Sequence, residues 1–144
     1  MGKFIYPNYD LGRDPSREVV EIVPFLKSRE VQTILDYHCG GGRNAVFLCN
    51  QGFQVIAADY ADVIKKLKEI AKSQKLPIKL STLLEDQASL DFPGTFFDAI
   101  LSWRWLHRGT VEQRESERLE LGRITKQGGY LIATVSSSRD VDLD

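Results

Sequence analysis

Short apolar runs, separated by stretches long enough for a helix, constrain this chain more than any other feature of its sequence. The runs fall at Thr33–Tyr37, Phe53–Ala58, Ile78–Leu84, Phe97–Trp103 and Tyr130–Val135. Segments such as VIAA and YLIATV are apolar throughout, which is typical of strands covered by helices on both faces of a parallel sheet. The intervening lengths suit crossover helices. The sequence therefore predicts an α/β fold with five parallel strands in a doubly wound sheet.

Two of the helices have clear sequence signals. Residues 14–29 begin with Asp14-Pro15, a capping residue followed by a proline suited to the first helical position, and continue with an apolar face that starts at Val19. Residues 62–74 carry one apolar stripe, and their lysines lie largely off it as a solvated face. At 144 residues, the chain is expected to form one domain over residues 1–144.

Charge and composition argue against several classes of function. The 19 basic and 20 acidic residues leave a formal net charge of -1, so nucleic acid is not expected as a partner. The longest apolar stretches are strand-sized and the amino terminus has no signal-like core, so neither a membrane span nor a secretory signal is predicted. The histidines and the two cysteines match no zinc pattern or disulfide framework, and no metal is expected. We therefore expect a cytoplasmic protein with reduced thiols.

A glycine-rich turn joins the first strand to the next helix. The segment ILDYHCGGGRNAVFL places strand, turn and helix start in succession, which brings backbone N–H groups and a positive helix end to one crevice. Gly40 and Gly42 would let a ligand approach the backbone closely. Asp59 ends the following strand, where a carboxylate can accept both hydroxyls of a ribose. These features predict a nucleoside-bearing ligand.

The glycine turn alone does not decide between two classes of cofactor. Gly40-x-Gly42-x-x-Ala45 together with Asp59 also satisfies the fingerprint for dinucleotides. Asp36, at the end of the first strand, separates the two classes, because a carboxylate there would repel a pyrophosphate and attract a cationic amino group. Asp36 therefore favours an amino-acid-bearing nucleoside over a nicotinamide dinucleotide.

Three segments resemble a known family. VQTILDYHCGGGRNAVFLCNQGFQVIAADY, EDQASLDFPGTFFDAILSW and RITKQGGYLIATV resemble class I S-adenosylmethionine-dependent methyltransferases, especially the tellurite-resistance and thiopurine-methyltransferase-like small-molecule enzymes. The likeness covers residues 31–136. It implies a Rossmann-like sheet in the order 3-2-1-4-5 with an N-terminal helix, lacking the usual sixth and seventh strands because the sequence stops at Asp144. It also implies S-adenosyl-L-methionine as cofactor and a small-molecule methyl acceptor.

The resemblance also assigns roles to individual residues. Asp36 and the Gly40–Gly42 backbone would hold the methionine amino and carboxyl groups. Asp59 would hold the ribose, and Tyr60 would pack on the adenine. Asp86, with the Gln87 backbone, would contact the adenine amino group, and Glu85 is a rival for this role. The residues assigned to the cofactor are Asp36, His38, Gly40, Gly42, Asn44, Asp59, Tyr60, Asp86, Gln87 and Trp103.

The cluster SWRWLHR, residues 102–108, is rich in aromatic and basic side chains, and it falls where the family's substrate side opens. His107 is the predicted base if the acceptor must lose a proton, because an unperturbed imidazole titrates near neutral pH. Arg104 would instead hold an anionic acceptor. A purely structural interpretation is also open, in which Trp103 and Trp105 only shield the sheet edge.

His38 departs from the family pattern, because it stands where the family has the first glycine. A histidine at a position with positive φ is strained, and its imidazole is expected to project toward the cofactor. This departure and the short chain keep two alternatives open. One is a non-catalytic module that binds the nucleoside or serves as a partner subunit, and the other is a nicotinamide-dependent oxidoreductase.

The last predicted strand, YLIATV, would leave an apolar sheet edge with free backbone donors and acceptors. Three coverings are open for this edge. They are a second copy of the chain in a homodimer, the opening helix, or further chain beyond this sequence.

Overall fold

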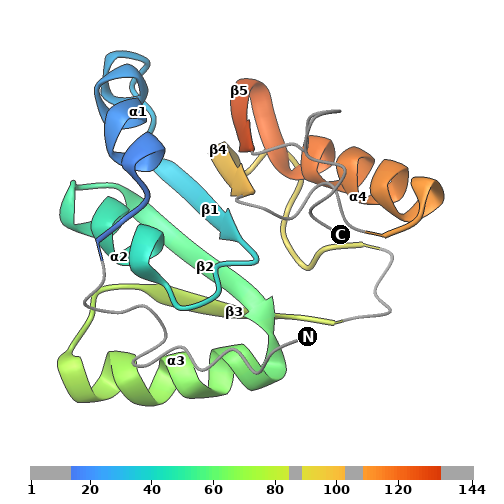
Figure 1. Ribbon diagram of the computed structural model, residues 1–144. Coiled ribbons are helices and arrows are strands. Elements are labelled where there is room, and N and C mark those ends of the chain that lie inside the picture. The colour runs from blue at the N-terminus through green and yellow to red at the C-terminus, as the bar shows by residue number, and fades with distance from the viewer. Residues whose placement is uncertain (1–13, 85–88, 103–108, 134–144) are drawn as a thin grey trace, which may run out of the picture.

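Five parallel strands and four helices make up the computed structural model, which describes residues 14–84, 89–102 and 109–133 (Figure 1). The strands are β1 (Thr33–Tyr37), β2 (Gln54–Tyr60), β3 (Lys79–Leu83), β4 (Phe97–Ser102) and β5 (Thr125–Ala133). The helices are α1 (Arg17–Ser28), α2 (Arg43–Asn50), α3 (Ala61–Gln74) and α4 (Val111–Ile124). The sheet order is β3-β2-β1-β4-β5, and every pairing is parallel. The predicted Rossmann-like α/β fold and its strand order are confirmed.

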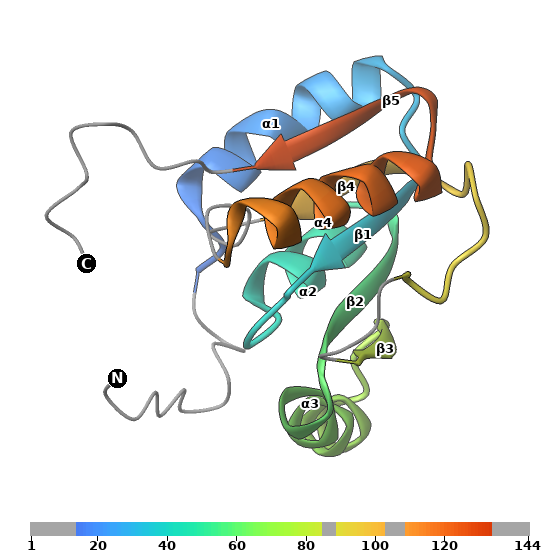
Figure 2. The same ribbon diagram turned by 90° about the vertical axis from the view of Figure 1, so that its right-hand side faces the viewer.

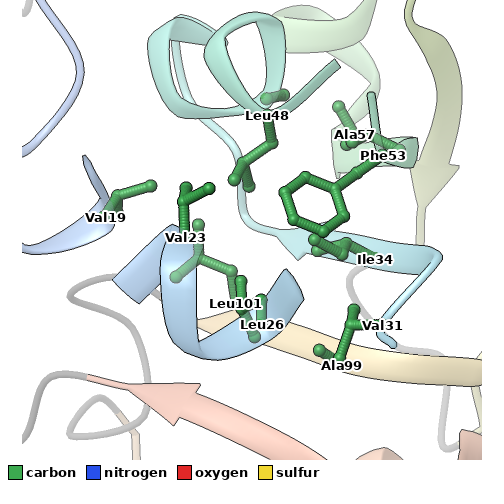
Figure 3. Packing of buried hydrophobic residues seen from close by; sticks show 12 residues of the cluster. Val19, Val23, Leu26, Val31, Ile34, Leu48, Phe53, Ala57, Ala99 and Leu101 are labelled. Atoms are coloured by element: carbon green, nitrogen blue, oxygen red, sulfur yellow. The ribbon is translucent and has the colours of Figure 1, made fainter. Parts of the chain in front are cut away.

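Helices cover both faces of the sheet. On one face, Val19 of α1 and Leu48 of α2 pack with Ile34 of β1 (Figure 3). On the other face, Leu121 of α4 packs with Leu35, the next residue of β1. Successive strand residues point to opposite faces, so one apolar strand supplies both cores. Figure 2 shows the arrangement from the α4 side, with α4 in front of the sheet and α1 and α2 behind it.

The start of α1 corrects one sequence prediction. Ser16, rather than Asp14, is the residue that precedes the helix, so Pro15 lies outside it. The Ser16 N–H donates to Oδ1 of Asn44 at 2.9 Å, and Nη2 of Arg43 donates to the Ser16 hydroxyl at 3.1 Å. The helix begins where these two α2 residues hold the chain. A local reading of Asp-Pro could not detect a contact made from 28 residues away.

A bulge lengthens β5 at its beginning. Phe97 pairs with Thr125, but Ala99 pairs with Tyr130, so the intervening residues of β5 leave the regular ladder. A Cβ added at Gly129 would lie 2.6 Å from Cγ2 of Thr125 and 2.8 Å from two backbone oxygens, which leaves room only for glycine. The strand therefore starts five residues before the predicted Tyr130.

α4 has few apolar anchors and a strong local cap. Thr110 Oγ1 accepts the Gln113 N–H at 3.1 Å, and Gln113 Oε1 accepts the Thr110 N–H at 2.8 Å. This reciprocal capping satisfies two amide donors at the start of the helix. Of the α4 residues, Leu121 and Ile124 are buried. Throughout residues 14–84, 89–102 and 109–133, no helix has the length and apolar character needed to cross a membrane.

Candidate functional site

The carboxyl ends of β1 and β2 meet at a tight turn formed by residues 38–42. Three residues of the turn have a positive φ: 58° at His38, 55° at Gly40 and 84° at Gly42. The Cys39 N–H donates to the Ala58 carbonyl at 3.0 Å, which ties the turn to β2. Gly42 then directly precedes α2, so the positive end of that helix opens at the same edge of the sheet.

The turn presents open backbone at Gly40. A Cβ added there would meet no heavy atom within 4 Å, so a ligand can approach the main chain at this position. The Gly40 N–H is not free, because it donates to Oδ2 of Asp59 at 2.9 Å. The predicted ribose acceptor and the predicted glycine turn are therefore in direct contact.

Asp59 is anchored by backbone amides. Its Oδ1 accepts the Tyr60 N–H at 2.7 Å, and its Oδ2 accepts the Gly40 N–H. Asp59 is 7% exposed. A carboxylate oxygen can accept two hydrogen bonds, so each oxygen retains capacity for a hydroxyl donor. The geometry is compatible with the predicted contact to a ribose.

Asp36, unlike Asp59, has a carboxylate oxygen without a hydrogen bond in the described part of the chain. This oxygen is Oδ2, and Asp36 is 2% exposed. Burial, and then the negative charge of Asp59, raise the pKa of Asp36 to about 7. A buried carboxylate without a partner is costly, and a cationic donor would stabilise its charged form. Asp36 thus fits a cationic amino group, as the sequence predicts.

Ser102 carries a second unpartnered oxygen that the sequence analysis did not single out. It ends β4, is fully buried, and its Oγ has no hydrogen-bond partner in the described part of the chain. β4 pairs with β1 up to Leu101 and Asp36, so Ser102 lies at the same sheet edge as Asp36. The sequence could have indicated Ser102 as a site residue, because it is the first residue of the SWRWLHR cluster.

His38 packs against neighbouring protein groups, and its expected projection toward the cofactor stays a prediction. Its side chain is 6% exposed, and its Nδ1 lies 3.7 Å from Oδ1 of Asp59. The imidazole packs edge to face with Tyr37 and Tyr60, with ring centroids 4.4 Å and 5.1 Å away. The imidazole is therefore packed between protein rings beside the ribose-binding candidate.

Tyr37 connects this edge to α4. Its hydroxyl donates to Oε2 of Glu117 at 2.5 Å, and burial followed by this hydrogen bond raises the pKa of Tyr37 well above its ordinary value. Glu117 was missed by the sequence analysis. The two residues are 80 positions apart, and Glu117 sits among other charged residues of a polar helix, so no local pattern marks it.

The structure brings together six of the predicted cofactor residues: Asp36, His38, Gly40, Gly42, Asp59 and Tyr60. Asn44 lies nearby, but its side-chain oxygen is used to hold Ser16. The remaining predicted residues lie outside the described residues, and their roles stay predictions: Asp86, Gln87, Trp103, Arg104 and His107.

The family model for the methyltransferase domain matches residues 34–129. This range contains the glycine turn, the strands β2, β3 and β4, nearly all of β1, and the first part of β5. The chain therefore belongs to the methyltransferase domain family. It is 29% identical over 112 residues to phosphoethanolamine N-methyltransferase 3 of Arabidopsis thaliana, covering 77% of this chain and 23% of that relative. It is 30% identical over 113 residues to demethylmenaquinone methyltransferase of Bacteroides fragilis, covering 76% and 45%. The chain thus spans less than half the length of either curated relative.

Solved structures share the fold. The PH0226 protein from Pyrococcus horikoshii OT3 superposes with a TM-score of 0.71 at 23% identity, covering 91% of this chain and 64% of that one. At this level of identity the likeness establishes the common α/β architecture alone. The chemistry must be argued from the residues of the site.

Proposed function

We propose that this chain binds S-adenosyl-L-methionine at the carboxyl ends of β1 and β2 and transfers its methyl group to a small molecule in the cytoplasm. The observation that carries the proposal is the buried Oδ2 of Asp36, which has no partner among the described residues and lies on the strand that leads into the open turn at Gly40. A cationic amino acid attached to a nucleoside matches this combination of carboxylate and accessible turn. A pyrophosphate would place negative charge against Asp36.

The residues of the chain would divide the binding between them. Asp36 would neutralise the amino group, and the turn at Gly40 would admit the amino-acid portion of the cofactor. Asp59 would accept the ribose hydroxyls with the capacity left after its two amide bonds. The bound cofactor supplies an electrophilic methyl group on sulfur, so the protein mainly has to align the acceptor and exclude water. Arg104 and His107 remain the predicted residues on the acceptor side.

The small-molecule acceptor is supported by two further observations. The names of the two methyltransferases reported above include small molecules, phosphoethanolamine and demethylmenaquinone. The net charge of -1 gives this chain no general attraction for a nucleic acid backbone. The chain covers less than half the length of each of these relatives, so the two tests below use this chain itself.

Calorimetry provides the first test. The full chain is titrated with S-adenosyl-L-methionine, with its demethylated product S-adenosyl-L-homocysteine, and with NADH. We expect the first two to bind and NADH not to bind. NADH binding without binding of the sulfonium cofactor would instead support an oxidoreductase and contradict the proposal.

Turnover provides the second test. Release of S-adenosyl-L-homocysteine is measured with phosphoethanolamine and with a demethylated quinol as candidate acceptors. Methyl transfer to a small acceptor supports the full proposal. Cofactor binding without transfer to any acceptor in a broad panel would leave a nucleoside-binding module and remove the catalytic part of the proposal.

A further inference from the structure

We propose that His38 is a positioning residue for the nucleoside of the cofactor, because its imidazole holds the Asp59 carboxylate and the Tyr60 ring in place. This inference rests on the proposed function and concerns a residue that departs from the family pattern. It assigns a purpose to a side chain that would otherwise be only a tolerated replacement for glycine.

Backbone conformation is the first observation. Four non-glycine residues in the described ranges have a positive φ: Glu30, His38, Lys75 and Thr95. Glu30, Lys75 and Thr95 are exposed, whereas the side chain of His38 is 6% exposed. A left-handed backbone costs a branched or bulky residue free energy that glycine would not lose. At His38 this cost is paired with a buried imidazole at the candidate site.

The surroundings of the imidazole are the second observation. Nδ1 of His38 faces Oδ1 of Asp59 at 3.7 Å, close enough for a favourable electrostatic interaction. The imidazole also packs edge to face on Tyr60, which directly follows Asp59 at the end of β2. One side chain therefore contacts both residues that are assigned to the ribose and the adenine.

The other neighbours of the imidazole fix it in turn. Tyr37 packs against the ring of His38 on one side, and the Tyr37 hydroxyl is held by Glu117 of α4. A shift of the imidazole against the Tyr37 ring would disturb this pair. His38 thus links Asp59 to Tyr37, which is itself held by the hydrogen bond to α4.

The experiment measures the affinity for S-adenosyl-L-homocysteine in five variants and the wild type. His38→Gly restores the family residue and removes the imidazole. We expect it to weaken binding about tenfold, the loss typical of one interaction with a charged group. His38→Asn keeps a nitrogen at the place of Nδ1 on a residue that tolerates a positive φ, and we expect it to bind within about threefold of the wild type.

Coupling to Asp59 provides the readout that simple packing would not change. Asp59→Asn is combined with His38→Gly, and the double variant is expected to lose less affinity than the sum of the two single losses, because part of the effect of His38 passes through that carboxylate. Lys75→Gly is the matched control, since it removes another left-handed side chain far from the site, at the end of α3. We expect its affinity to equal that of the wild type.

Two results would overturn the inference while leaving the proposed function intact. One is wild-type or tighter binding by His38→Gly, and the other is fully additive loss in the double variant. Failure of the wild type to bind either S-adenosyl compound would overturn the proposed function and this inference with it. Thermal melting verifies that every variant is folded, and His38→Asn decides the result if His38→Gly is not.

Discussion

The amino ends and the carboxyl ends of the parallel strands, here called the amino edge and the carboxyl edge of the sheet, hold carboxylates in opposite conditions. Asp98 at the amino edge is partly exposed, whereas Asp36 at the carboxyl edge is buried. At the amino edge, Oδ2 of Asp98 accepts the N–H groups of Gln32 and Thr33 at 2.9 Å and 3.0 Å. Its Oδ1 pairs with Nζ of Lys126 at 3.1 Å. At the carboxyl edge, Asp36 has an oxygen with no partner in the described part of the chain.

The pKa values follow this difference. Burial acts to raise the pKa of Asp98, but the hydrogen bonds from Thr33, Gln32 and Lys126 outweigh it and lower the pKa to about 2. Burial and the charge of Asp59 raise the pKa of Asp36 to about 7. A carboxylate that the protein satisfies stabilises the fold, whereas one that it leaves unsatisfied is available to a ligand.

The structure also has a cavity at the amino edge of the sheet, away from Asp36. A hollow of about 280 Å³ is lined mainly by apolar side chains, among them Phe53 and Phe97. Within the described ranges, neither of the two buried side-chain oxygens without a partner, on Asp36 and Ser102, belongs to its lining. The cavity and the unsatisfied polar groups therefore lie at opposite ends of the strands, and the proposed site rests on the polar groups.

The largest expected effect concerns stability and pH at Asp36. The folded protein keeps this proton up to about pH 7, whereas an unfolded chain loses it near 3.8. Asp36 therefore favours the folded state below about pH 4, and this contribution is lost as the pH rises to about 7. Relative to the wild type, Asp36→Asn should gain up to about 4 kcal/mol in unfolding free energy between pH 4 and pH 8. Urea denaturation across this range measures it, and a constant difference would contradict the raised pKa.

The next effect sharpens the comparison on the binding side. Asp36→Asn should weaken S-adenosyl-L-homocysteine binding by about 100-fold at pH 8, because the charged partner of the amino group is lost. Asp98→Asn, the matched change at the other edge, should leave the affinity within about twofold. Calorimetry on both variants decides the point, and equal losses would show that the two edges do not differ in function.

Asp98→Asn should instead lower stability. The pKa of Asp98 is depressed from 3.8 to about 2, so its charged form contributes above about pH 4 and loses this contribution as the pH falls toward 2. We expect a loss of about 2 kcal/mol in unfolding free energy at pH 7. The loss should shrink in denaturation experiments near pH 2, and an effect independent of pH would be inconsistent with the assignment.

The smallest effect tests the packed side of the carboxyl edge. Tyr37→Phe removes the hydroxyl that donates to Glu117 and should cost about 1 kcal/mol of unfolding free energy, the net value of one hydrogen bond. Cofactor affinity should stay within about twofold, since the ring that supports His38 is retained. Tyr37→Phe with unchanged stability would mean that the bond to α4 contributes nothing.

Strand-level features of this fold were predictable because they depend on local pattern. β1 has the predicted bounds, and β2 extends two residues past the predicted Ala58, to Tyr60. β5 could not be bounded, since its bulge depends on the close approach of Gly129 to the backbone of Asp98. The first residues of α1 depend on Asn44 in the same way. Contacts between distant segments set these boundaries.

The site divides along the same line. Asp36, Gly40 and Asp59 could be predicted because their positions at strand ends and in a glycine turn fix where they lie. The packing of the His38 ring could not be predicted, because it depends on two rings from different strands. Glu117 carries no signal in the sequence, since its partner comes from another element.

The contacts of Arg43 and Asn44 with Ser16 have one more consequence. These residues open α2 directly after the glycine turn, yet they hold the beginning of α1. The amides of Val19 and Val20 donate to the Ser16 carbonyl, so their exchange with solvent deuterium depends on how firmly that residue is held. A nucleoside that immobilises the turn should slow exchange at these two amides, and the first helix would then report occupancy of a site that it does not touch.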